Sequence, residues 1–104
     1  SSDLLAICYE KTGKYKKALA AISKGKEFHS EHSYLLDIVE YRLLHKNYIH
    51  EIEYEKLLYD TLECVRHELP HGFLAMQEND LLEYYEENRR YKDAYVLLKK
   101  QMQK

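Results

Sequence analysis

The sequence has very few of the residues that interrupt helices. Of its 104 residues, three are glycine, one is proline and none is tryptophan, whereas leucine, glutamate, lysine and tyrosine are abundant. Sandwiches and barrels need frequent Gly and Pro turns between short strands, so this composition argues against both. It favours an all-α fold, because most of the abundant residues are good helix formers.

Cysteine is scarce as well. Cys8 and Cys64 are far apart and each lies in an apolar helical pattern, which excludes a disulfide framework and a CxxC metal or redox motif. We expect both to be buried structural thiols. The six histidines lack the accompanying Cys or carboxylate ligands that a zinc site needs. We therefore expect no metal and no cofactor.

Charge of one sign and long apolar runs are also lacking. The formal net charge is -2, which excludes the uniformly basic surface of a protein that binds nucleic acid by neutralising phosphates. No run approaches the ~18 apolar residues of a membrane span, and no signal-peptide pattern opens the chain. These features predict a cytoplasmic protein with no direct nucleic-acid or membrane partner.

Apolar residues at helical spacing predict successive helix pairs. Thr12-Gly13-Lys14 ends the first helix and the next begins at Tyr15, while Ser33 can cap the third. The strongest break is Pro70-His71-Gly72, which must separate two helices. The predicted pairs cover about residues 3–29, 33–68 and 73–103, in one domain over residues 1–104.

Two segments of the chain repeat each other. LLAICYEKTGKYKKAL (4–19) and DLLEYYEENRRYKDAY (80–95) align without a gap. In each, a small Ala lets the second helix approach the first, and we expect the Tyr before it to fill the turn. Neither hairpin buries its apolar stripe alone, so such repeats stack in arrays. The predicted packing residues are Tyr9, Tyr15 and Ala18 in the first segment and Tyr85, Tyr91 and Ala94 in the second.

This pattern resembles the tetratricopeptide repeat (TPR). The first segment matches the TPR consensus, whereas in the last one Arg89 replaces the turn glycine and Leu82 replaces a small residue. The middle pair departs most. The resemblance implies a right-handed α-α superhelix of about three TPR-like helix pairs. Its consensus positions in the first segment are Leu5, Ala6, Tyr9, Gly13, Tyr15 and Ala18.

Over most of its length the chain looks like the C-terminal repeats of bacterial peptide-sensing regulators of the Rap phosphatase, NprR and PlcR type. That likeness implies the ligand-sensing part of a transcriptional or phosphorelay regulator used in quorum sensing. Regulators of this kind carry an N-terminal effector part that this chain lacks. We therefore expect the chain to be a fragment of a longer protein.

The sequence offers no catalytic arrangement, so we expect no enzyme activity and no catalytic residue. The acidic run over residues 78–88 is either a solvated helix face or, on the TPR resemblance, part of a concave groove that binds a peptide. An acidic groove would favour a cationic peptide or protein segment. By helical spacing, the groove candidates are Asp3, Glu10, Asp37, Glu40, Asn79, Glu83, Glu86 and Glu87. The alternative is a structural or oligomerisation module that stacks on further repeats and dimerises through its repeat ends.

Overall fold

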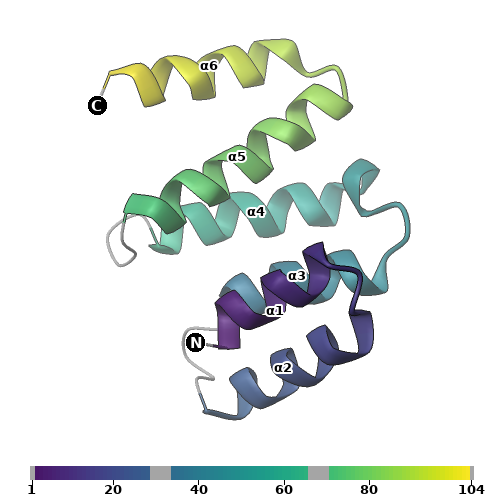
Figure 1. Ribbon diagram of the computed structural model, residues 1–104. Coiled ribbons are helices and arrows are strands. Elements are labelled where there is room, and N and C mark those ends of the chain that lie inside the picture. Colours follow the sequence, from purple (N-terminus) through teal and green to yellow (C-terminus); the bar gives the residue numbers. More distant parts are fainter. Residues whose placement is uncertain (1, 29–33, 66–70, 104) are drawn as a thin grey trace. The chain divides into compact units, whose positions relative to one another are not determined.

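The computed structural model describes residues 2–28, 34–65 and 71–103, and all the regular elements in these ranges are helical (Figure 1). The predicted all-α class is therefore confirmed for them. The Ser33 cap and Pro70 lie outside the described residues. His71 and Gly72, which were expected to belong to the break, are instead the first residues of a helix. The α-helices are α1 (Ser2–Lys11), α2 (Tyr15–Phe28), α3 (Tyr34–Leu44), α4 (Ile52–Val65), α5 (His71–Glu87) and α6 (Tyr91–Met102), with a short 3₁₀-helix η1 (Tyr48–His50) before α4.

The chain divides into two compact units, Ser1–Tyr48 and Ile49–Lys104. In the first, α1 and α2 form a hairpin, and α3 packs against both of them. In the second, α5 packs against α4 on one side and forms a hairpin with α6 on the other. Each unit thus contains one hairpin and one further helix. The division falls within the predicted middle pair, between α3 and α4.

Small residues bring the three helices of the first unit together. The core contains Ala6 of α1, Ala21 and Ile22 of α2, and Leu36 and Val39 of α3. Because Gly25 of α2 has no side chain, Leu36 packs directly against the helix backbone there. A Cβ atom at Gly25 would lie 2.7 Å from Leu36 Cδ1. This close approach fixes how α3 covers the α1–α2 hairpin.

The second unit has a more aromatic core. Tyr54 of α4 and Tyr84 of α5 place their ring centroids 6.1 Å apart in a tilted pair, an arrangement that aromatic rings favour. Ala94 of α6 is buried in the hairpin, as Ala18 is in the first unit. The other buried apolar residues described in this unit are Leu58, Leu62, Leu74, Leu81, Tyr85 and Leu97.

The two segments that repeat in sequence fold into the same turn. Gly13 (φ 77°) and Arg89 (φ 56°) occupy corresponding left-handed positions, which end helices by satisfying the last carbonyl groups. A side chain supports each turn at the corresponding residue, Thr12 or Asn88, by donating to the carbonyl four residues earlier at 2.8 Å. The paired backbone hydrogen bonds are Gly13 to Glu10 and Arg89 to Glu86, both 3.1 Å, and Lys14 to Tyr9 and Arg90 to Tyr85, both 2.8 Å.

Candidate functional site

Of the predicted groove residues, Glu10 at the end of α1 forms an ion pair with the chain's own Arg42. The Arg42 guanidinium on α3 donates from Nε to Glu10 Oε2 at 2.7 Å and from Nη2 to Glu10 Oε1 at 2.8 Å. The side chains of Arg42 and Glu10 are 7% and 12% exposed. This bidentate pair joins α1 to the helix that covers it, so the Glu10 charge is already neutralised.

Asp37 and Glu40 on α3 also face a base of their own unit. Lys26 Nζ on α2 lies 2.7 Å from Asp37 Oδ1 and 2.9 Å from Glu40 Oε1. Burial lowers the Lys26 pKa, but the hydrogen bonds and charges of the two carboxylates outweigh this effect, and the pKa is raised above 10.5. Asp3, in the first turn of α1, has a polar or electrostatic partner too.

The four candidates on α5 are in a different situation. Asn79, Glu83, Glu86 and Glu87 are exposed, and among the described residues their side chains have no hydrogen-bond or ion-pair partner. Asn79, Glu83 and Glu86 share one helix face, because they follow each other at spacings of four and three residues. Glu78 is buried, so the acidic run is not a solvated face throughout.

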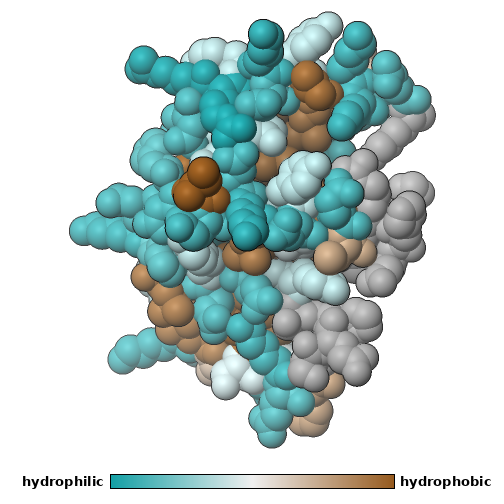
Figure 2. Space-filling view, turned by 180° about the vertical axis from the view of Figure 1, so that it is seen from behind, coloured by the Kyte–Doolittle hydropathy of each residue, from teal (hydrophilic) through white to brown (hydrophobic). Residues whose placement is uncertain are grey.

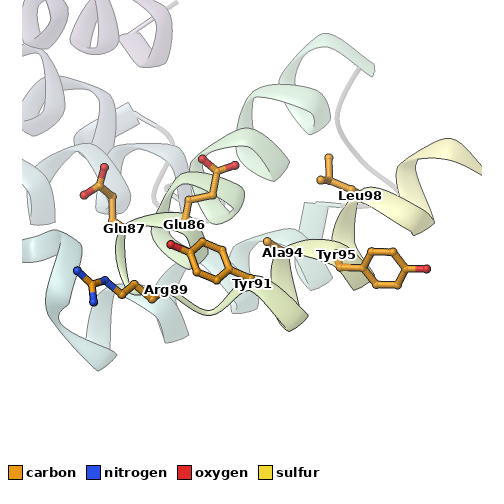
Figure 3. Close-up of a pocket in the computed structure, with 7 residues that line it drawn as sticks. All are labelled: Glu86, Glu87, Arg89, Tyr91, Ala94, Tyr95 and Leu98. Carbon is orange, nitrogen blue, oxygen red and sulfur yellow. The ribbon is translucent and has the colours of Figure 1, made fainter.

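A shallow hollow of about 750 Å³ lies beside Glu86 and Glu87, at the turn end of the α5–α6 hairpin. Glu86 and Glu87 project from the end of α5, and Tyr91 and Leu98 project from α6 (Figure 3). Both acidic and apolar groups therefore border one concave surface. The residues that line it are Glu86, Glu87, Arg89, Tyr91, Ala94, Tyr95 and Leu98.

At the turn end of the first hairpin, residues of α3 lie against the hairpin. A hollow of about 440 Å³ there has walls from the hairpin and from the segment that follows it. The hairpin residues Glu10, Lys11 and Tyr15 align in sequence with Glu86, Glu87 and Tyr91. The remaining walls are Arg42 and Leu43 of α3 and Tyr48. The hollow at α5–α6 lacks this third wall among the described residues.

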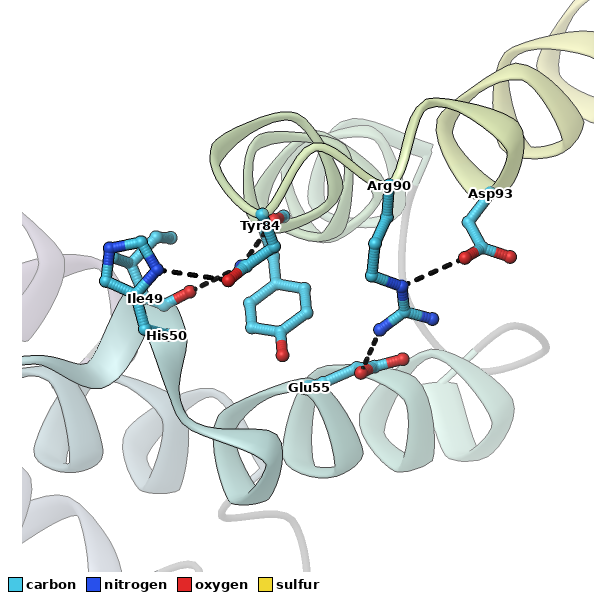
Figure 4. A network of polar contacts seen from close by, with 7 residues as sticks. Ile49, His50, Glu55, Tyr84, Arg90 and Asp93 are labelled. Carbon is cyan, nitrogen blue, oxygen red and sulfur yellow. Dashed lines mark hydrogen bonds and ion pairs between the residues drawn. The ribbon is translucent and has the colours of Figure 1, made fainter.

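Arg90 makes polar contacts with two helices of the second unit. Its guanidinium donates to Glu55 of α4 and to Asp93 of α6 (Figure 4), and it lies 5.0 Å from the centroid of the Tyr85 ring. The hydrogen bond to Glu55 outweighs desolvation and raises the Arg90 pKa. Arg90 therefore links α4 and α6 at the turn.

Asn88 adds a second polar link in this unit. Its amide donates to the carbonyl of Ile49 at 2.7 Å, and its Oδ1 lies 3.0 Å from Nδ1 of His50 (Figure 4). The amide thus ties the end of α5 to the segment before α4. Nearby, burial and then the Glu55 charge raise the pKa of Tyr84 above 10.0.

Polar and charged side chains cover much of the face drawn in Figure 2, and apolar side chains reach it in separate patches. Several large apolar side chains are exposed on α6. Tyr91, Tyr95, Leu98 and Met102 recur at helical spacing and are all exposed. They form a stripe along one side of the helix. This stripe continues from the hollow toward the C-terminal end of α6.

The burial expected for four side chains is wrong. Cys8 is exposed, whereas its counterpart Tyr84 packs against Tyr54 of α4. Cys64 is exposed because it lies beside the buried stripe of α4 that contains Leu58 and Leu62. Tyr15 and Tyr91 are 60% and 64% exposed. Backbone hydrogen bonds close these turns, and the rings line hollows instead.

The bases that neutralise the first unit's acids were not among the residues predicted from sequence. Lys26 and Arg42 are distant along the chain from the acids Asp37 and Glu10 that they contact. No local spacing indicates these pairs. The alignment of the two hairpins does match Glu10 with Glu86, so it could have singled out Glu86 once the Arg42 contact was known.

A scan against models of protein families found no match, and searches of curated proteins and of solved structures found none either. Within the described ranges, no group of three or more His, Cys, Asp or Glu side chains could hold a metal ion. None of the described helices is long and apolar enough to cross a membrane.

Proposed function

We propose that this chain is a non-catalytic module that binds a peptide or protein segment, and that the α5–α6 hairpin carries its binding surface. The carrying observation is the contrast between the two units. Of the predicted groove acids in the first unit, Glu10 pairs with Arg42, and Lys26 pairs with both acids of α3. The three exposed acids on α5 have no base among the described residues. Unpaired carboxylates beside an apolar hollow favour a segment that combines basic and apolar side chains.

The proposal includes a TPR-like architecture. The matching turns at Gly13 and Arg89 and the buried Ala18 and Ala94 support it. We propose that the helix pairs belong to a right-handed superhelix and that the chain is the ligand-sensing part of a bacterial transcriptional or phosphorelay regulator. A ligand would act there by favouring one curvature of the array over another.

Calorimetric titration of the whole chain with short peptides tests this function. Lysine-rich and glutamate-rich peptides of equal length and apolar content are compared at low and moderate salt. We expect saturable binding of the lysine-rich peptide alone, weakened by salt. Glu86→Ala should weaken it, while Glu53→Ala, which removes an exposed carboxylate from α4, should not. Equal binding of both peptides, or of neither, would contradict the proposal.

A second candidate function is that of a structural module that stacks on other repeats or on a second copy. The exposed stripe of Tyr91, Tyr95, Leu98 and Met102 favours it, because an apolar helix face of this kind suits a self-complementary contact. Light scattering separates the two functions. A concentration-dependent dimer that Leu98→Asp returns to monomer, with no peptide binding, would support the structural module.

A further inference from the structure

We infer that the binding surface of the α5–α6 hairpin accepts an amphipathic α-helix with a basic side chain placed on Glu86, in the way that α3 covers the α1–α2 hairpin. This inference rests on the proposed function and specifies the partner. Its basis is an internal comparison, since the hairpin occurs twice, once covered by α3 and once with no helix of the described residues in the corresponding place.

The covering helix changes the exposure of one apolar position above all. Ile22 of α2 is 1% exposed beneath Leu36 and Val39 of α3, whereas Leu98, the aligned residue of α6, is 42% exposed. The neighbouring positions are alike, because Ala21 and Leu97 are both buried. Leu98 therefore marks the surface that a covering helix would bury.

Both hairpins also have a glutamate at the turn, Glu10 in the first and Glu86 in the second. Glu10 accepts two hydrogen bonds from Arg42 of α3, and its counterpart Glu86 lines the open hollow with no partner among the described side chains. Glu87 stands where the first hairpin has Lys11, and Arg89 stands where it has Gly13, so two carboxylates and one base line the second site. A base on the incoming helix would meet two carboxylates there.

The contacts also give the partner helix a direction. On α3, Leu36 sits on Gly25, and Arg42, later in the helix, reaches Glu10 at the hairpin turn. A helix bound to α5–α6 in the same way has its C-terminal end at the turn. Basic side chains are favourable at that end, because the helix dipole is negative there.

Where the two hairpins differ, the partner must differ from α3. Met102 stands in place of Lys26, so the acids that pair with Lys26 have no base to meet. Gln101 stands in place of Gly25, so a residue smaller than Leu36 fits there. The expected partner is thus an aliphatic-faced helix with small or apolar residues toward its N-terminus and Arg or Lys toward its C-terminus.

A synthetic peptide tests this directly. It has the sequence of residues 34–48 with Leu36→Ala, Asp37→Ala and Glu40→Ala, and it carries a fluorophore for anisotropy titration against the whole chain. The changes fit it to α6 and remove its contacts with Gly25 and Lys26 of the first hairpin, where α3 already occupies the face. A scrambled peptide of the same composition controls for non-specific cationic binding.

We expect the peptide, but not its scramble, to bind and to gain helicity. Glu86→Lys in the chain should weaken binding by about tenfold, and Arg42→Glu in the peptide should recover it with that variant. Leu98→Asp should also weaken binding, whereas Glu53→Lys should leave it unchanged. The substituted residues Glu53, Glu86 and Leu98 are all exposed, so the variants should keep the circular dichroism of the original chain.

Two results would overturn the inference. One is failure of the peptide to bind, and the other is binding that Glu86→Lys and Leu98→Asp leave intact. If a proline-containing cationic peptide binds where the helical one does not, the surface takes an extended segment and the proposed function survives. If neither peptide binds and the chain forms a dimer that Leu98→Asp dissolves, a second copy covers this face and the proposed function fails as well.

Discussion

The Glu10–Arg42 pair holds two charges in a place that water barely reaches. Its attraction offsets the cost of removing both groups from water, so its net contribution to stability is small. Losing one partner is different, because the remaining charge stays buried without compensation. Single and double replacements should therefore have very different effects.

We predict that Arg42→Ala lowers the free energy of unfolding by about 3 kcal/mol, whereas the double change Glu10→Leu with Arg42→Met costs less than about 1 kcal/mol. Urea unfolding followed by circular dichroism measures both. Equal losses in the two variants would show that the cost comes from packing of the Arg42 stem rather than from an unpaired charge.

Position 89 offers a second residue-level test, because Arg89 adopts the left-handed conformation that Gly13 adopts in the aligned turn. A side chain is strained there and glycine is not. Arg89→Gly should raise the free energy of unfolding by about 1 kcal/mol, and Gly13→Ala should lower it by about the same amount. Thermal unfolding of the two variants measures the differences. The same sign for both changes would contradict the shared turn.

Sequence reasoning succeeded at residues whose role is local. The Gly13 turn and the small residues Ala18 and Ala94 follow from spacing within a few helical turns, and the structure has them as expected. It failed for Cys8 and Tyr15. Burial of these side chains depends on which distant helix lies above them, and an apolar pattern in the sequence cannot reveal that.

The helices themselves were largely predictable for the same reason. The beginnings of α2 and α6 at Tyr15 and Tyr91 agree with the repeat. The sequence did not predict which face of each hairpin another helix would cover. Equivalent residues such as Ile22 and Leu98 are indistinguishable by pattern, yet one lies beneath α3 and the other is exposed. Element pairing is a non-local property.

A substitution at Gly25 tests how closely α3 packs against α2. In a helix interior, Gly→Ala usually stabilises by about 1 kcal/mol. Here the added Cβ would lie 2.7 Å from Leu36 Cδ1 and 2.9 Å from Ser2 Cβ, so the neighbours must shift. We predict that Gly25→Ala lowers the free energy of unfolding by about 1 to 2 kcal/mol, measured by urea unfolding.

Ser23→Ala is the matched control for Gly25→Ala, because Ser23 is exposed on the same helix. It should leave stability unchanged or raise it by a few tenths of a kcal/mol. Stabilisation by Gly25→Ala as well would mean that α3 does not pack on the Gly25 backbone. The covered hairpin would then be a poor guide to the uncovered one.

Over the whole molecule, the predicted acidic groove separates into two kinds of residue. Glu10 is paired with Arg42, and the two acids of α3 are paired with Lys26, whereas the acids exposed on α5 are not paired with described bases. The net charge of the chain gives no sign of this difference. The difference arises because ion pairs form between helices that are far apart in sequence. Composition and periodicity therefore located the acids but did not indicate which of them were available to a partner.

Alkaline pH should weaken both units. In the first, the raised pKa of Lys26 means that its charged form is favoured by folding, and this contribution is lost as pH rises above about 10.5. In the second, burial raises the pKa values of Tyr84 and Tyr85 above 10.0, so folding favours their neutral forms. Their contributions are complete below pH 10.0 and are lost as pH rises through the raised values.

We predict that helicity falls above pH about 10 and that Tyr84→Phe with Tyr85→Phe moves the loss to higher pH, because the two phenols whose pKa values burial raises are then absent. Circular dichroism follows helicity, and ultraviolet absorbance follows tyrosinate formation in the same samples. The control is Tyr15→Phe with Tyr91→Phe, which removes two exposed phenols. It should leave the unfolding midpoint unchanged. If both pairs moved the midpoint equally, the alkaline transition would report overall negative charge rather than the two buried rings.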